Sequence, residues 1–335
     1  MTVGYQKAEL IQLGQQSVFD TAVAATFKYR GMLTFNENIE NYEPDYPQGV
    51  RGQTINQMST QAKGWTGEYE ADLTAEELIT FLDMGFKGGV TASGAMADKT
   101  WTYLPPPAAN PSPKPYTLEY AVKDFSTSWA RQVPNVYCSQ IVITIPQNGP
   151  AKMKCSLFGG AVVSGHTMTA ALSYISGLEI VPGGKFKLYV DDAAGSIGGT
   201  QKTATLLNGE ITLMAGIRPD ATIDGRTNLD YSQVLFEDVA AEAKLLVNYN
   251  AFADAELTKW RTLASRYVQL KAIGATLGGS NRSIQIDLPC QYVAGQQVGR
   301  QANANTLALA LKAKYDATIA GTFKVTVVNA RTALS

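Results

Sequence analysis

The residue types that carry most enzyme chemistry are scarce in this chain or lack partners at a useful spacing. The single histidine, His166, lies among glycine, serine and threonine, and no carboxylate stands near it in the sequence. General acid–base catalysis and metal binding both need such companions. No sequence signature of a nucleophile elbow, zinc protease, phosphate-binding loop or dinucleotide-binding loop is present. Gly195–Gly199 (GSIGG) precedes no Lys-Ser/Thr pair and predicts a turn. The sequence therefore predicts no catalytic, cofactor-binding or metal-binding residue.

Carboxylates are the second candidate chemistry, because glycosidases act through a pair of them. The acidic residues gather in two long polar segments, 36–63 and 218–241, rather than at strand ends in an aromatic cleft. We interpret them first as solvated loop charges, with a polysaccharide-degrading enzyme as the distant alternative. The four tryptophans could form a sugar platform, but packing in a core or interface explains them better. The acids singled out are Glu37, Glu40, Glu43, Asp45, Asp220, Asp224 and Asp230, and the tryptophans are Trp65, Trp101, Trp129 and Trp260.

The composition narrows the class of protein. The 28 basic and 29 acidic side chains nearly cancel, which argues against a dedicated nucleic-acid or membrane-surface binder. Charged residues make up only 17% of the chain, and this favours either a surface covered by partners or a β protein rich in small residues. Cys138, Cys155 and Cys290 have no metal-like spacing and read as reduced core residues. The first residues lack a targeting pattern and no stretch suits a membrane-spanning helix, so we expect synthesis in the cytoplasm.

The elements that would position these residues are mostly strands. Alternating and β-branched stretches predict them, whereas Pro105–Pro115, with six prolines, predicts a stiff loop. A short helix is expected at Lys7–Leu13. The strands are expected at Gly31–Phe35, Tyr116–Val122, Tyr137–Ile145, Ala151–Phe158, Gly183–Asp191, Leu206–Met214, Ser283–Leu288, Leu307–Lys314 (with a helix as the alternative) and Thr322–Asn329.

Two amphipathic helices interrupt the strands. The first begins with a capping box at Thr74 and Glu77 and ends at the glycines that follow. The second is expected to begin at Asp254 and to continue to Gly274. The apolar stripes that should pack these helices on their sheets are Leu78, Phe81 and Leu82 in the first, and Leu257, Trp260, Leu263 and Tyr267 in the second.

The two helices stand in similar surroundings. Residues 64–89 and 243–274 each run from an alternating stretch through a capping residue into a helix, after a long polar segment. For segment 36–63 an extended hairpin is the alternative to a loop. The pattern predicts two tandem β-sandwich domains, each with one flanking helix, over residues 1–165 and 166–335, through an internal duplication.

Several stretches carry a family resemblance. Leu10–Tyr29 (LIQLGQQSVFDTAVAATFKY) is similar to an N-terminal arm, Thr100–Pro107 to a Trp-Thr-x-x-Pro motif with its proline-rich loop, and Tyr116–Tyr120 with Val136–Gly160 to paired strands. In the order of these stretches and in their residue types, the chain resembles the major tail tube proteins of long, non-contractile-tailed bacteriophages. The resemblance is closest over residues 1–160, and VITIPQNGPAKMKCSLFGG (Val142–Gly160) is its strongest part.

The resemblance implies a structural protein of the virion tail, assembled in the bacterial host cytoplasm. Its β-sandwiches would form stacked rings, and strands of neighbouring copies would join into a barrel through which DNA passes without specific binding. The polar segments and the arm 4–28 would contact the next ring, and the acids in those segments would contact it or face the lumen. Two domains per chain predict a trimeric ring with pseudo-sixfold symmetry, with a hexameric ring as the alternative. Tape-measure and tail terminator proteins are the implied partners. A capsid decoration or baseplate protein is the rival structural function.

Overall fold

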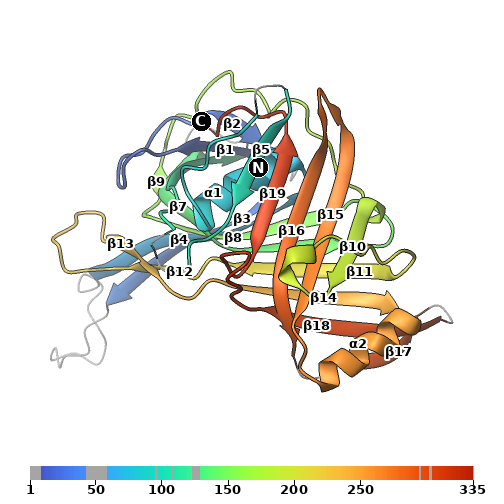
Figure 1. Ribbon diagram of the computed structural model, residues 1–335. Coiled ribbons are helices and arrows are strands. Elements are labelled where there is room, and N and C mark those ends of the chain that lie inside the picture. Colours follow the sequence, from blue (N-terminus) through green and yellow to red (C-terminus); the bar gives the residue numbers. More distant parts are fainter. Residues whose placement is uncertain are drawn as a thin grey trace, which may run out of the picture.

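The computed structural model describes residues 9–42, 59–94, 97–107, 109, 111–122, 129–293, 296–301 and 304–334. Strands make up 54% of the chain and helical residues 10%, so the prediction of a mainly β protein is confirmed. Figure 1 shows long strands in curved layers, with one helix enclosed by them and a second helix at the margin of the molecule. The tandem duplication stays a prediction.

The largest layer consists of eight antiparallel strands, called the main sheet below. Along most of these strands buried apolar residues alternate with exposed polar ones, as expected for a sheet with one face on the core. Each strand pairs with the next. In spatial order the strands are β3 (Met32–Tyr42), β4 (Ser59–Asp72), β8 (Lys152–Gly159), β7 (Arg131–Ile145), β11 (Leu206–Met214), β14 (Ala240–Asn248), β18 (Ala304–Ala313) and β17 (Gln297–Gln301).

Smaller sheets complete the layers around the core. One contains β2 (Phe27–Tyr29), β1 (Glu9–Gln15), β6 (Tyr116–Val122), the first part of β7 and β9 (Val163–Ser164). The other contains β10 (Phe186–Asp191), β15 (Arg266–Leu277), β16 (Ser280–Tyr292), β19 (Lys324–Asn329) and β5 (Lys99–Tyr103). The end of β16 also pairs with β18, so this sheet continues into the main sheet.

Three short pieces lie outside these layers. The strands β12 (Ile217–Asp220) and β13 (Gln233–Phe236) form a separate hairpin within the predicted polar segment 218–241. Two 3₁₀ turns, η4 (Gly183–Lys185) and η5 (Ala194–Ser196), flank β10. The arms of segment 36–63 belong to β3 and β4, in agreement with the hairpin alternative, while residues 43–58 lie outside the described residues.

The helix predicted at Lys7–Leu13 is wrong for its described part, because Glu9–Gln15 form β1. This strand lies between two partners, with Ile11 opposite both Tyr29 and Tyr120. Seven residues would give a marginal helix, whereas two ladders of backbone hydrogen bonds and the burial of Ile11 and Leu13 fix the strand.

The first predicted helix is α1 (Ala75–Gly85), and it begins as expected. The Thr74 hydroxyl oxygen accepts a hydrogen bond from the backbone N–H of Glu77 at 3.2 Å, and that hydroxyl donates to the Glu77 carboxylate at 3.1 Å. Leu78, Phe81 and Leu82 have no exposed surface. Every other residue of α1 is buried as well, so this helix is enclosed rather than flanking.

The second helix, α2 (Ala251–Arg261), is shorter than predicted and begins at another cap. The Asn250 side-chain oxygen, rather than Asp254, accepts from the backbone N–H of Ala253 at 3.1 Å. The helix ends before Leu263, whose φ of 53° lies in the left-handed region and whose side chain is 70% exposed. Tyr267 belongs to β15. The expected stripe therefore reduces to a buried Leu257 and a partly buried Trp260.

The interior is one continuous hydrophobic cluster that takes residues from both halves of the chain. Strands from the two predicted domains pair directly, since β7 bonds to β11 and β5 bonds to β19. The boundary at 165/166 therefore does not separate two hydrogen-bonded units, and the division into two domains stays a prediction.

The two halves nevertheless repeat one unit in the same register. Leu33 lies opposite Tyr69 in the β3–β4 pair, and Gly209 lies opposite Leu245 in the β11–β14 pair. A shift of 176 residues relates the members of each pair (33 to 209 and 69 to 245). The same shift carries the cap of α1 onto the cap of α2 (74 to 250) and places the two 11-residue helices at equivalent positions.

Even an irregularity is repeated. The register of β3 and β4 changes after Glu40, and Asn41 then lies opposite Thr60. The shift of 176 carries this pair onto Ile217 and Phe236, which lie opposite each other in the β12–β13 hairpin. The outer strands correspond through their pairing rather than through the same shift. Lys154 lies opposite Glu70, and Ala308 lies opposite Leu246, so Lys154 corresponds to Ala308. Their partners in the next strand, Val142 of β7 and Gln297 of β17, correspond in turn. The main sheet is thus β3-β4-β8-β7 followed by its equivalent, β11-β14-β18-β17.

Candidate functional site: the open face and edges of the main sheet

One face of the main sheet lies on the core and the other, here called the open face, carries the charged side chains of its strands. Directly opposed residues in neighbouring strands point to the same side. The core side therefore includes Trp65, Tyr69 and Leu245, which are at most 1% exposed. The alternate residues of the same strands, among them Glu68 and Lys244, belong to the open face.

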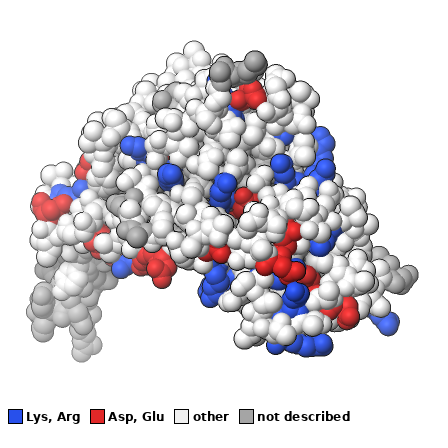
Figure 2. Space-filling view, viewed as in Figure 1, with Lys and Arg blue, Asp and Glu red and all other residues white. Residues whose placement is uncertain are grey.

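Acidic and basic residues of the open face are paired across strands. The Lys154 ammonium lies 2.9 Å from the Glu68 carboxylate, and Lys152 lies 3.2 Å from Glu70. In the second half, Lys244 is 3.1 Å from Glu210. These pairs are solvent-exposed, so each stabilises the fold by no more than about 1 kcal/mol. Their larger consequence is that the open face carries little net charge, because each of these lysines stands next to a carboxylate. Figure 2 shows acidic and basic side chains side by side along the hollowed lower margin of the molecule.

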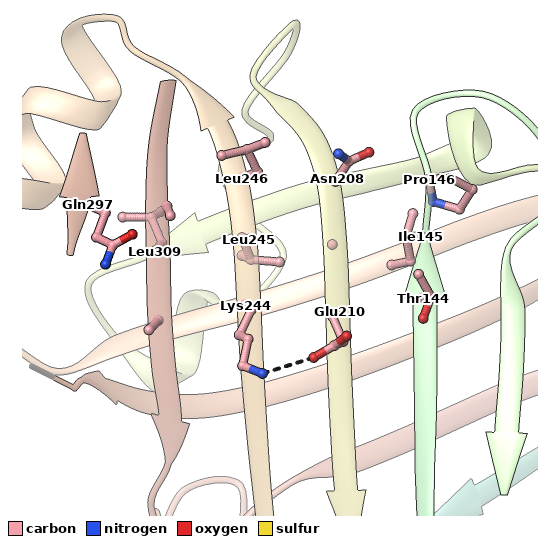
Figure 3. Close-up of a pocket in the computed structure, with 13 residues that line it drawn as sticks. Thr144, Ile145, Pro146, Asn208, Glu210, Lys244, Leu245, Leu246, Gln297 and Leu309 are labelled. Carbon is pink, nitrogen blue, oxygen red and sulfur yellow. Dashed lines mark hydrogen bonds and ion pairs between the residues drawn. The ribbon is translucent and has the colours of Figure 1, made fainter. Parts of the chain in front are cut away.

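A shallow hollow of about 510 Å³ lies on this face across β7, β11, β14 and β18. Most of the residues that line it carry apolar or amide side chains, and Ala308, Leu309 and Ala310 of β18 are among them. The Lys244–Glu210 ion pair lies at one end of it (Figure 3). Among the residues that line it, Glu210 is the single carboxylate; it is ion-paired with Lys244, and Thr144 lies opposite it in β7. The hollow is therefore a mostly apolar surface with one ion pair.

The two ends of the main sheet are open strand edges. β3 pairs only with β4, and β17 pairs only with β18, among the described residues. Such edges invite pairing with another chain unless lysine, proline or a bulge blocks them. Neither strand contains lysine or proline, and the irregularity of β3 comes only after Glu40, so Met32–Glu40 keep a regular edge. All five residues of β17 are exposed, including the apolar Val298 at 60%.

The acids singled out in the first polar segment are divided by this geometry. Glu40 lies opposite Ala62, which places it on the open face, whereas Glu37 lies opposite Trp65, on the core side of the sheet. Both are exposed, because β3 extends beyond the core. Glu43 and Asp45 lie outside the described residues.

The acids of the second polar segment lie on the β12–β13 excursion. Asp220 accepts a hydrogen bond from the side chain of Gln233 at 2.7 Å, and Asp224 accepts one from the backbone of Arg226 at 3.2 Å. The position of Asp230 differs from the prediction, which placed this side chain at the lumen or between rings. Its side chain is buried, ion-paired with Arg226 at 3.0 Å, and accepts from the backbone N–H of Ala161 at 3.2 Å. It fixes the excursion to the first half of the chain.

His166 lies beside an acid that the sequence did not reveal, although its Nε2 makes no hydrogen bond within the described residues. Its Nε2 lies 3.3 Å from the buried carboxylate of Glu119 on β6, far away in the chain. That carboxylate also accepts from the backbone and hydroxyl of Thr169, at 2.7 and 2.8 Å. The group ties the segment after β9 to the small sheet. Within the described ranges, no serine or cysteine side chain bonds to this group.

Three carboxyl groups of α1 have raised pKa values. Burial raises the pKa of Glu76, Glu77 and Asp83, although hydrogen bonds to each carboxylate oppose this. Altered pKa values often indicate active sites. Here the partners are structural: Arg282 on β16 lies 2.6 Å from Glu76, and Gln15 donates to Asp83 at 2.7 Å.

The cysteines and two of the four tryptophans have structural positions too. Cys138, Cys155 and Cys290 are free and buried, as the sequence indicated. Trp65 and Trp101 are buried in the core, so they offer no stacking face to a sugar. Within the described part of the chain, no group of histidine, cysteine and acidic residues has the geometry of a metal site. Among the same residues no helix is long and apolar enough to cross a membrane.

No protein-family model matches the chain, and no curated protein matches it.

Proposed function

We propose that this chain is the structural subunit of a bacteriophage tail tube, in which rings stack around a channel that DNA crosses during ejection. The observation that carries the proposal is the repeated unit of the main sheet. Two four-stranded units with the same register are joined side by side at β7–β11, and both ends of the resulting sheet are open. A chain built in this way has the form of two neighbouring positions in a larger ring.

Symmetry favours such a ring. Identical head-to-tail contacts generate a closed ring when the rotation between copies divides a full turn, and an open filament when contacts continue along an axis. Three chains with two equivalent units each would give a ring with pseudo-sixfold symmetry, with a hexamer of chains as the alternative. Their main sheets would form a closed barrel. Barrels with more than about sixteen strands enclose an aqueous channel.

The open face suits the lining of a DNA channel. A protein binds DNA non-specifically by placing lysine and arginine against the phosphates. The lysines of this face stand beside carboxylates, as in the Lys154–Glu68 and Lys244–Glu210 pairs, so no basic stripe forms along the described strands. Phosphates would meet a nearly neutral wall and pass without being held.

The remaining parts of the proposal rest on the family resemblance. The protein would be found in the virion tail after assembly in the host cytoplasm, with itself as its main partner. Tape-measure and tail terminator proteins would contact the inside and the end of the tube. We expect no catalytic activity and no cofactor.

Electron microscopy of the purified protein, alone and with co-expressed tail proteins, tests the function directly. We expect rings that stack into tubes, with three copies of the chain in each ring by mass measurement. Particles that stay monomeric under all these conditions would contradict the proposal. Discrete oligomers that never stack would favour a capsid decoration or baseplate protein. Release of sugars in a polysaccharide hydrolysis screen would favour the enzyme alternative.

A further inference from the structure

The pairing of β7 with β11, here called the internal joint, predicts how two copies of the chain pair with each other. At the internal joint, β7 and β11 pair antiparallel, with Ile143 opposite Ile211 and Val142 opposite Thr212. In the repeated unit, β17 is equivalent to the end of β7, and β3 is equivalent to β11. The two edge strands are therefore the counterparts of two strands that already bond to each other.

We infer that β17 of one copy pairs antiparallel with β3 of a second copy, with Val298 opposite Phe35 and Gln297 opposite Asn36. The register follows from the equivalences. Val142 corresponds to Gln297, and Thr212 corresponds to Asn36 through the shift of 176 residues. This inference rests on the proposed ring and adds the edges and the residues that close it.

Burial supports this register. Ile143 and Ile211 at the internal joint have no exposed surface. Their counterparts are also apolar, but Val298 is 60% exposed and Phe35 only partly buried, against Trp65 and Tyr120. Pairing of the two edges would cover both side chains on the core side of the joined sheet, and each buried apolar surface favours association.

Strand direction supports it too. The eight strands of the main sheet alternate in direction, so the first and the last, β3 and β17, are antiparallel to each other. An even number of alternating strands lets the next copy continue the same alternation without a break. The contact is head to tail and repeats around an axis, as ring closure requires.

A pair of cysteines tests the register. In the variant carrying both Gln297→Cys and Asn36→Cys, the two thiols of neighbouring copies would lie directly opposite on the open face, within the range of a disulfide. Both residues lie at opposite ends of the sheet within one chain, so a bond between them must join two chains. The native cysteines are buried and give little background. Mild oxidation of assembled protein should give covalent dimers and then a covalent trimer as the largest product.

The matched control displaces the pair along the same face. In the variant with Gly299→Cys and Asn38→Cys, the inferred register separates the two positions by four residues, or about 13 Å, too far for a disulfide. Rings that form without cross-linking of the 297/36 pair, or that cross-link the control equally well, would overturn the inference while the proposed function stands. If neither rings nor cross-links form, both fail. Covalent products of up to six chains would support the β17–β3 pairing and show that the ring contains six copies instead of three.

A single charge provides a second readout. Val298→Glu leaves the isolated subunit intact, because this side chain is exposed there, but it would place an unpaired carboxylate inside the joint. We expect monomers with unchanged thermal unfolding and at least a tenfold loss of ring formation. Leu263→Glu is the control, since Leu263 is similarly exposed but belongs to neither edge strand. Normal rings from Val298→Glu would overturn the pairing.

Discussion

The two helices of this protein have the same design and opposite environments. α1 and α2 have equal lengths, begin at equivalent caps and follow strands with the same register. Yet all of α1 is buried, whereas only three residues of α2 are. The difference comes from the elements that cover α1, which are β7, β19, β16 and β5 together with the C-terminal residues around Arg331. A repeated backbone therefore does not repeat its surroundings.

The sequences of the two helices match their surroundings. Leu78, Ile79 and Leu82 of α1 correspond to Asp254, Ala255 and Thr258 of α2 through the shift of 176 residues. The first three side chains have no exposed surface, and the latter three are exposed. Apolar side chains at these three positions suit an enclosed helix, and polar or small side chains there suit a helix at the surface.

The largest effect is expected from exchanging residues at one of these equivalent positions. Leu82→Thr should lower the free energy of unfolding by about 3–5 kcal/mol, because it opens a cavity and buries a hydroxyl. The reciprocal change, Thr258→Leu, should alter it by less than about 0.5 kcal/mol at its exposed position. Urea unfolding at one fixed protein concentration measures both. Equal effects would show that α2 is covered like α1.

A smaller effect is expected at the buried polar position that the helices share. Glu256 of α2 corresponds to Thr80 of α1, and Arg266 donates to the Glu256 carboxylate at 2.7 and 2.8 Å. Glu256→Gln should cost about 3 kcal/mol, since it leaves the buried Arg266 without its main countercharge. Thr80→Val removes a hydrogen bond from Arg331 and one with Tyr29, and should cost about 1–2 kcal/mol. Thermal and urea unfolding of the two variants can be compared directly; a larger loss for Thr80→Val would reverse this ranking.

The buried carboxyls of α1 should make stability depend on pH. Burial raises the pKa of Asp83 in the folded protein, so the folded state keeps its proton at pH values where the unfolded chain, with a pKa of about 4, has lost it. The contribution of this group is full below the unfolded pKa and is lost as the pH rises through the folded pKa. From pH 4 to 7 the wild type should therefore lose stability relative to Asp83→Asn. Parallel curves of unfolding free energy against pH would contradict this.

The smallest effect is expected beyond the end of α2. The long helix expected from the sequence would have placed Leu263 on its packed face, where truncation to alanine costs about 2–5 kcal/mol. In the structure this side chain is 70% exposed, so Leu263→Ala should change the unfolding free energy by less than about 0.5 kcal/mol. A loss above about 2 kcal/mol in the isolated subunit would show that Leu263 packs in a core.

The limits of the sequence are visible at particular residues. The capping pair Thr74 and Glu77 is a local signal and was read correctly. The stretch after Trp260 fits both a helical and an alternating pattern, and the register of β15 against β10 and β16 decided between them. Asp230 and His166 could not be placed, because their neighbours Ala161 and Glu119 are distant in the sequence and only the fold brings them close.

The sequence by itself determined the class of the fold, the existence of two strand–helix units and the scarcity of residues for chemistry, because periodicity, capping and composition are local properties. Only the tertiary structure decided that the units share one sheet, which helix is enclosed, and that the charges of the open face cancel. Those features depend on which strands meet across the chain. Strand register, read at the internal joint of β7 and β11, is also what defines the two free edges.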